Sequence, residues 1–114
     1  MTADDFRRLA LELPETVEGA HMGHPDFRVD GKIFATLSPD GVFGMAKLTP
    51  DQQEILCAAE PDTFVPVPGG WGRSGSTHVR LAVADDDAVR GALRLAWRGR
   101  APAKMQHLLP EGGA

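Results

Sequence analysis

The sequence predicts a two-layer α+β fold, with helices packed on one face of an antiparallel β-sheet made of a meander and one later strand. Two amphipathic stretches have helical apolar spacing, and tight-turn signals separate short β-rich runs. The sequence has no run of about 18 apolar residues, so it predicts no membrane helix. A chain of 114 residues with one cysteine can bury a core without disulfides, so we expect a single domain over 1–114.

A first helix is predicted from Thr2, which can cap it, to Pro14, which disfavours helical dihedrals in the preceding residue. Its apolar residues recur at i, i+3, i+4 and i+7: Phe6, Leu9, Ala10 and Leu13. A last helix is predicted over 85–100, capped by Asp85. Its apolar stripe contains Val89, Leu93, Ala96 and Trp97. We therefore expect each of these helices to bury one face.

Turn residues divide the segment after the first helix into strands. The pair Asp30-Gly31 stands between two β-rich runs and supplies the positive φ values of a tight hairpin. A second turn at 38–41 (SPDG) separates the next two runs. With a weaker strand over 16–22, these runs predict a three- or four-stranded antiparallel meander.

A second helix is predicted to start at Thr49, with Pro50 in its first turn and Gln52 completing a capping box, and to stop at Pro61. Three apolar residues are expected to form its buried face: Ile55, Leu56 and Ala59.

Residues 61–75 contain three prolines and four glycines, which forbid an ordinary helix and argue against a long central strand. A loop of this length in a small domain is typical of a functional or mobile segment. The run 76–84 then alternates polar and apolar residues and predicts the later strand. Its buried face is expected to contain Thr77, Val79, Leu81 and Val83. The tail at 110–114 is too small and polar to pack, and we expect it to be disordered.

The formal net charge of −4 conceals an uneven distribution of charge. Residues 1–63 contain five basic and twelve acidic side chains, whereas residues 64–114 contain seven basic and four acidic ones. Such asymmetry favours an anionic partner for the second part of the chain. A solvated basic surface without a partner explains the same pattern, so both interpretations stay open.

Residues with catalytic or metal-binding chemistry are scattered along the sequence. His21 and His24 precede a proline rather than lying on a recognisable helix, and Cys57 lies among apolar residues. Ser74 and Ser76 have no Gly-x-Ser-x-Gly elbow, and the glycine-rich loop beside them lacks the Lys-Ser/Thr pair of a phosphate-binding loop. We therefore expect a non-enzymatic protein with no catalytic residues, metal site or cofactor.

Basic residues in the second part of the chain indicate a candidate phosphate-binding surface. Arg94 and Arg98 lie on one stripe of the last helix without an acid at helical spacing, whereas Arg90 has acids three and four residues before it. Guanidinium groups bind phosphates, and a nearby indole can stack on a base. The candidate DNA contacts are Arg73, Arg80, Arg94, Arg98, Arg100 and Lys104, with Trp71 as the stacking residue. The same arginines also complement a helix dipole, so the pattern alone leaves the choice open.

Sequence blocks at 24–37 (HPDFRVDGKIFATL), 68–81 (PGGWGRSGSTHVRL), and 96–98 (AWR) with 101–104 (APAK) span nearly the whole chain. Together they resemble the MmcQ/YjbR family of small bacterial proteins. The resemblance implies a CyaY/frataxin-like fold, sometimes described as a double-wing DNA-binding arrangement, and brings no catalytic residues. The family pattern usually has an aromatic residue immediately before the Thr-x-Val strand, where this chain has Ser76. If that aromatic residue belongs to a ligand surface, Trp71 alone has to provide the aromatic contact with a ligand in this chain.

Three functions follow as hypotheses. The first is weak, salt-dependent DNA binding through a C-terminal basic face. The second is binding of a small molecule, such as a metabolite or drug, by the 61–75 loop and a sheet face. The candidate residues for this second function are Phe34, Phe43, Trp71 and His78. The third is a protein-interaction module or homodimer formed at an exposed sheet edge. In each case we expect a cytoplasmic protein without a membrane partner.

Overall fold

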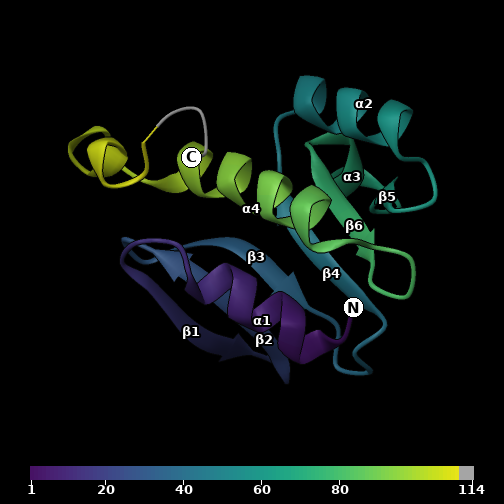
Figure 1. The fold of residues 1–114 in the computed structure, drawn as a ribbon, viewed down its shortest axis with the longest axis horizontal. Helices are drawn as coiled ribbons and strands as arrows, with labels where there is room; N and C mark the ends of the chain where they lie inside the picture. Colours follow the sequence, from purple (N-terminus) through teal and green to yellow (C-terminus); the bar gives the residue numbers. More distant parts are fainter. Residues whose placement is uncertain (111–114) are drawn as a thin grey trace.

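Six antiparallel strands form one sheet in the computed structural model, which describes residues 1–110 (Figure 1). The strands are Thr16–His21 (β1), His24–Val29 (β2), Lys32–Leu37 (β3), Phe43–Lys47 (β4), Phe64–Pro66 (β5) and Ser76–Arg80 (β6). Their order across the sheet is β1-β2-β3-β4-β6-β5. The first four strands form the predicted meander, and β6 is the later strand. The short edge strand β5 lies inside the segment that was expected to be a loop. Of the tail expected at 110–114, only Pro110 is among the described residues.

The two predicted turns are confirmed. Asp30 and Gly31 have φ values of 52° and 75°, as a tight hairpin requires. In the second turn the Asp40 carboxylate accepts hydrogen bonds from the Ser38 hydroxyl at 2.6 Å and the Val42 N–H at 3.0 Å. These two bonds lower the pKa of Asp40, because they stabilise its charged form.

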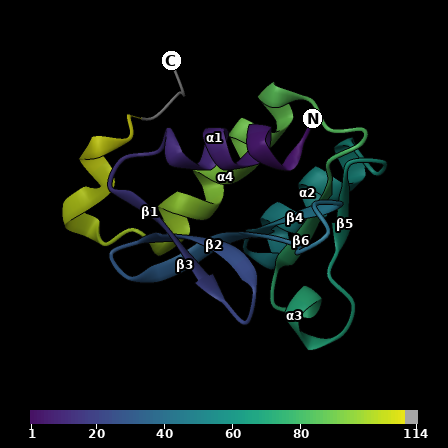
Figure 2. The same cartoon turned by 90° about the horizontal axis from the view of Figure 1, so that it is seen from below.

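Two helices, α1 (Ala3–Leu11) and α4 (Asp86–Arg100), cover one face of the sheet (Figure 2). The Thr2 side chain caps α1 and forms a capping box with Asp5. The Asp85 carboxylate caps α4 by accepting a hydrogen bond from the Ala88 N–H at 2.8 Å. The predicted α+β fold with helices against one sheet face is therefore confirmed, together with its capping residues.

Apolar side chains of both helices and the sheet form one core between the layers. Its largest fully buried members are Trp97, Phe6, Phe27, Phe34 and Phe64. The indole N–H of Trp97 donates to the Pro14 carbonyl at 2.9 Å and joins α4 to the chain between α1 and β1. Phe6 lies so close to Gly44 of β4 that a Cβ there would be 2.5 Å from its ring. The approach of α1 to the sheet therefore requires glycine at this position.

A third long helix, α2 (Pro50–Ala59), begins as predicted, with a capping box between Thr49 and Gln52. Its expected buried face (Ile55, Leu56 and Ala59) is wrong, because no residue of α2 is buried and Ile55 is 66% exposed. The helix contacts β5 at the sheet edge and does not lie over the core. Only Leu56 and Cys57 pack partly against the core.

The strand predicted over 76–84 ends earlier, at Arg80. The Val83 and Ala84 N–H groups donate to the carbonyls of Arg80 and Leu81, at 3.2 and 3.3 Å, and turn the chain toward α4. Leu81 is buried as expected, but Val83 is 53% exposed because the alternation stops at this turn.

A short helix, α3 (Gly70–Arg73), lies on the side of the sheet opposite α1 and α4 (Figure 2). Gln53 of α2 fixes its position. The Gln53 side-chain amide donates to the carbonyls of Gly72 and Ser76 at 2.9 and 3.0 Å and to the Thr77 hydroxyl at 3.2 Å. Helix α3 packs closely against the preceding chain, because a Cβ on Gly72 would lie 1.7 Å from the Val67 carbonyl oxygen. Helix α2 thus holds α3 and β6 mainly by a polar contact.

We expect Gly44→Ala to lower the free energy of unfolding by about 1–3 kcal/mol, because the added methyl group must displace the Phe6 ring. The matched control is Gly91→Ala in α4, where a Cβ meets nothing within 4 Å. Alanine there should raise the free energy of unfolding by about 0.5–1 kcal/mol. Urea unfolding followed by circular dichroism measures both values. Equal shifts in the two variants would contradict the close packing of α1 on β4.

We expect Gln53→Leu to lower the free energy of unfolding by about 0.5–1.5 kcal/mol and to accelerate hydrogen exchange in α3, because the Gly72 and Ser76 carbonyls each lose their side-chain donor and keep only a backbone one. Glu54→Gln, on the exposed side of the same helix, should change stability by less than about 0.5 kcal/mol. Unfolding titrations with residue-resolved hydrogen exchange provide the measurement. Unchanged exchange at residues 70–73 in the Gln53 variant would show that another contact holds α3.

Candidate functional site

The sheet face opposite α1 and α4, here called the open face, carries side chains from alternate positions of the strands. In β4, Gly44 and Ala46 are buried under the helices, so Phe43, Met45 and Lys47 point the other way. The same alternation in β6 places three further side chains on this face, namely Ser76, His78 and Arg80. Among residues 1–110, no long helix covers the open face (Figure 2).

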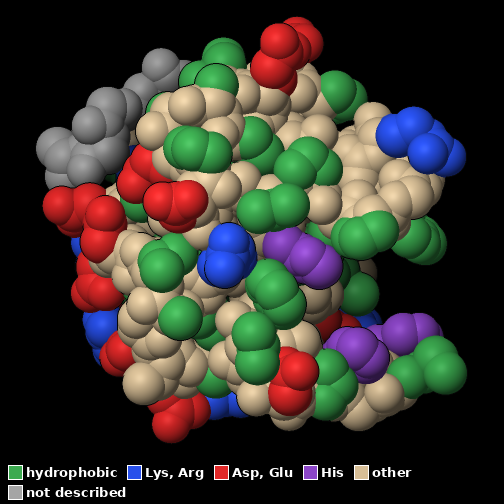
Figure 3. Space-filling model, turned by 90° about the vertical axis from the view of Figure 1, so that its right-hand side faces the viewer, with side chains coloured by type: hydrophobic (Ala, Val, Ile, Leu, Met, Phe, Trp, Pro, Cys, Tyr) green, Lys and Arg blue, Asp and Glu red, His purple; other side chains and the backbone are tan. Residues whose placement is uncertain are grey.

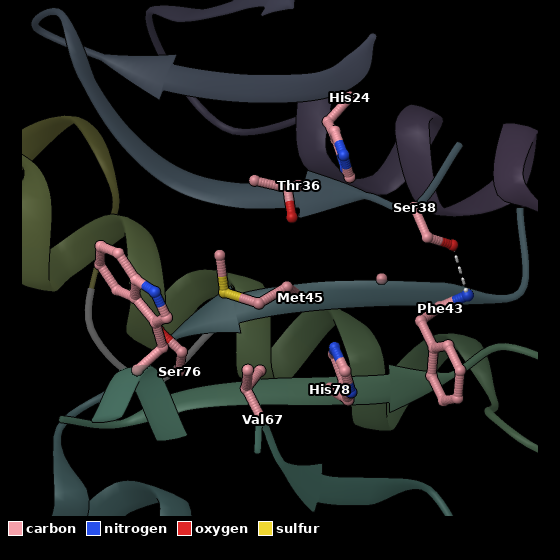
Figure 4. Close-up of a pocket in the computed structure, with 10 residues that line it drawn as sticks. His24, Thr36, Ser38, Phe43, Met45, Val67, Ser76 and His78 are labelled. Atoms are coloured by element: carbon pink, nitrogen blue, oxygen red, sulfur yellow. Dashed lines mark hydrogen bonds between the residues drawn. The ribbon is translucent and has the colours of Figure 1, made fainter. Parts of the chain in front are cut away.

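A hollow of about 420 Å³ occupies the open face beneath α3, and we call it the open-face hollow. It is lined by His24, Thr36, Ser38, Phe43, Gly44, Met45, Val67, Trp71, Ser76 and His78. In Figure 4, Met45 lies at its centre, with His24 and Thr36 on one side and Val67 and His78 on the other. Figure 3 shows the open-face hollow in profile, with histidine side chains along its lower margin. Its volume falls within the range of small-molecule sites.

Aromatic rings stand at both ends of the open-face hollow. Phe43 and His78 are stacked, with ring centroids 4.7 Å apart and an interplanar angle of 24°. At the other end the Trp71 side chain is 73% exposed, which is unusual for a residue of this size. The Lys47 ammonium lies 5.8 Å from the centroid of the Trp71 ring, a cation-π distance. The hollow can therefore accept a planar group at either end.

The polar groups of the hollow differ in their freedom to bind a ligand. The Ser38 hydroxyl is occupied, because it accepts a hydrogen bond from the Phe43 N–H at 3.0 Å and donates to Asp40. In the part of the chain that the structure describes, the Thr36 hydroxyl and the His78 imidazole have no hydrogen-bond partner. Burial lowers the pKa of His78 because it penalises the charged form. The neutral ring offers one N–H donor and one nitrogen acceptor.

Three of the four residues proposed for a small-molecule site come together here: Phe43, Trp71 and His78 all line the open-face hollow. Phe34 does not, because it is 0% exposed beneath the helices. The register of β2 with β3 pairs Phe27 with Ala35 and Arg28 with Ile33, which leaves Phe34 as an extra, unpaired residue. Such a bulge turns Phe34 to the same face as its neighbour Ala35. The placement of Phe34 at a ligand surface was therefore wrong.

Several lining residues were not singled out from the sequence. Met45 and Thr36 follow from the alternation of β4 and β3 once the covered face is known, whereas Val67 and His24 approach the hollow from outside the central strands. Ser76, the position where the resemblance implies an aromatic residue, lies in the wall of the hollow. A serine in place of a large ring leaves more of this space open.

The six basic residues proposed as DNA contacts fall into two groups. Arg73 on α3 and Arg80 at the end of β6 lie on the open-face side, and both are exposed. The others belong to the opposite layer, in α4 and in the short 3-10 helix η1 (Ala103–Leu108): Arg94, Arg98, Arg100 and Lys104. The proposed contacts therefore do not share one face.

Arg94 and Arg98 have protein partners that their helical spacing did not reveal. The Arg94 guanidinium donates to the Pro110 carbonyl at 2.8 Å. Arg98 donates to the Leu109 carbonyl and, at 3.3 Å, to the Gln106 side chain. Both guanidinium groups thus hold the segment after α4 against the helix. Arg90 pairs with Asp87 at 3.5 Å, as expected, and also with Glu12.

The remaining predictions concern a metal site, a membrane helix and an exposed sheet edge. Among residues 1–110, no three His, Cys, Asp or Glu side chains come close enough to hold a metal ion together. None of the described helices is long and apolar enough to cross a membrane. The edge strand β1 is largely exposed, and its use by a protein partner or a second copy stays a prediction.

Comparisons with known proteins agree with this fold. A crystal structure of the Deinococcus radiodurans protein DR2400, with the family domain DUF419, is similar with a TM-score of 0.73 and 23% sequence identity. The similarity covers 99% of this chain and 94% of that one, and at this identity it concerns the fold alone. Among curated proteins, none matches the chain. The family model described as YjbR matches residues 11–99, which is most of the sequence, and the chain therefore belongs to the YjbR family.

Proposed function

We propose that this protein binds a small molecule with a planar, largely apolar part in the open-face hollow. The observation that carries the proposal is a space of about 420 Å³ on the uncovered sheet face, with an exposed tryptophan beside it. Small-molecule sites are typically concave surfaces lined by apolar and aromatic side chains with a few polar groups, and this hollow has that composition.

The chemistry of the lining supports a ligand with one flat region and a few hydrogen-bonding groups. Met45, Val67 and Phe43 supply apolar surface, and methionine adapts its shape to different ligands. Covering roughly 100 Å² of apolar surface by a ligand ring contributes about 2.5 kcal/mol. The Thr36 hydroxyl and the neutral His78 ring can then fix the ligand's orientation through hydrogen bonds.

Ser76 offers a direct way to test this site. Its side chain lines the hollow, beneath Trp71 and beside Lys47. We expect an aromatic side chain at this position to occupy the space that a ligand would use. The substitution lies on the open face, away from the core between the sheet and α1.

We expect a screen of metabolites and aromatic fragments by thermal shift to find compounds that raise the melting temperature. A ligand at about 100 times its Kd stabilises the folded state by about 2.7 kcal/mol. Ser76→Phe and Trp71→Ala should each weaken such a compound at least about tenfold, because the first fills the hollow and the second removes its exposed ring. Val83→Ala, a change at an exposed apolar residue outside the hollow, is the control. Equal stabilisation of all variants would contradict binding in the hollow.

DNA binding is a second candidate function, and one observation favours it. Arg73 and Arg80 lie on the same side as Trp71, and within residues 1–110 neither forms an ion pair with an acid. The contact set that we propose for DNA is therefore Arg73, Arg80 and Trp71, without Arg94 and Arg98, which bind the C-terminal carbonyls.

If DNA binds this face, a plot of log K against log salt should lose about one unit of slope in Arg73→Gln and again in Arg80→Gln, because each removes one phosphate contact. Arg94→Gln should leave the slope unchanged, since that side chain is engaged with Pro110. Fluorescence anisotropy with a labelled duplex at several salt concentrations measures the slopes. No binding at about 50 mM salt, or a slope altered only by Arg94→Gln, would exclude this mode of DNA binding.

A further inference from the structure

A second, smaller hollow lies at the end of β4, and we call it the strand-end hollow. It has a volume of about 160 Å³ and lies between the start of α2 and the end of α4. Its lining consists of Lys47, Leu48, Thr49, Gln52, Gly99 and Arg100. Lys47 also reaches toward the open-face hollow, because its ammonium donates to the Ser76 hydroxyl at 3.4 Å and lies near the Trp71 ring. Lys47 thus lines the strand-end hollow and contacts two residues that line the open-face hollow.

The two cations of the strand-end hollow have no acidic partner. Within residues 1–110, neither Lys47 nor Arg100 lies within 4.0 Å of a carboxylate, and the α2 acids Asp51 and Glu54 are not paired with them. The other arginines on the helix side of the molecule do have partners. Arg7, Arg8 and Arg90 pair with acids, and Arg94 and Arg98 bond to carbonyls.

Arg100 is the more unusual of the two cations. Its Nε is buried without a hydrogen-bond partner, alone among the buried side-chain nitrogen and oxygen atoms of the described residues. A buried donor without an acceptor is destabilising, and more so when the group is charged. An anion bound to the terminal nitrogens of this guanidinium would offset part of the cost of burying its charge.

The surroundings of the strand-end hollow also favour negative charge. The start of α2 contributes the partial positive charge of a helix N-terminus. The opposite effect at the end of α4 is reduced, because the Gln106 side-chain amide donates to the carbonyls of Arg98 and Ala101 at 3.0 and 2.9 Å. The volume suits a carboxylate, sulfonate or phosphate group and is too small for a whole drug-sized molecule.

We infer that the ligand of the open-face hollow is an organic anion, whose planar part lies against Trp71 and Met45 and whose acidic group is held by Lys47 and Arg100. This inference rests on the proposed small-molecule function and names the chemical class of its ligand. Lys47 is the link between the two parts, because it contacts the wall of one hollow and lines the other.

The test uses two fluorescent probes with the same aromatic rings. Anilinonaphthalene sulfonate carries a negative charge, and phenylnaphthylamine is its neutral counterpart. We expect the sulfonate probe to bind the wild-type protein about tenfold more tightly than the neutral one, through a charge-assisted contact. Lys47→Met and Arg100→Met should each remove most of this difference while leaving the affinity of the neutral probe within about twofold, and Arg100→Lys should retain part of it.

Lys32→Met is the matched control, because Lys32 is an exposed cation of β3 that lines neither hollow. Loss of the sulfonate preference in this variant, with the preference retained in the Lys47 and Arg100 variants, would overturn the inference. Equal affinities of the two probes for the wild type, both abolished by Ser76→Phe, would overturn the inference and leave the proposed hollow intact. Binding of both probes that is unaffected by Ser76→Phe would contradict the proposed function itself. Melting temperatures of all variants confirm that each is folded.

Discussion

The burial of one sheet face under α1 and α4 is the constraint on which the rest of the structure depends. Both helices pack their apolar stripes against this face. Helix α1 approaches so closely that Phe6 lies where a side chain at position 44 would be. The third long helix, α2, lies at the sheet edge and buries no residue of its own. The opposite face therefore has no amphipathic helix left to cover it. A concave, partly apolar surface remains there.

The shape of that surface depends on polar contacts more than on apolar packing. The Gln53 amide links α2 to α3 and β6, and thereby sets where the Trp71 ring stands over the strands. Gly72 permits this arrangement because its missing side chain lets the chain approach Val67. A site built in this way has a floor of strands and a wall whose position depends on the Gln53 side-chain amide. Ser76 lines the same hollow, and its hydroxyl accepts a hydrogen bond from the Lys47 ammonium at 3.4 Å.

Local chemistry allowed much of the fold to be predicted from the sequence. Thr2, Thr49 and Asp85 cap the helices as expected, and Asp30-Gly31 forms the expected hairpin, because caps and turns depend on a few adjacent residues.

The features of the fold that were missed depend on residues far apart in the chain. The bulge that buries Phe34 arises from the pairing of β2 with β3, and the exposure of α2 arises from its position at the sheet edge. The partners of Arg94 and Arg98 lie beyond the end of their own helix, where helical spacing cannot reveal them.

For the candidate site, composition and turn residues indicated Trp71 and the loop around it. The lining residues Thr36 and Met45 could be identified only once the covered face of the sheet was known.

The central claim is that the open face, rather than Arg94 and Arg98 of α4, is the binding surface of this YjbR-family protein. Backbone amide chemical shifts recorded during titration with a bound aromatic compound test it most directly. For a neutral aromatic compound we expect changes in β2, β3, β4, β6 and α3, with the largest at residues that line the open-face hollow. Changes confined to α4 and η1, or spread evenly over the surface, would contradict it.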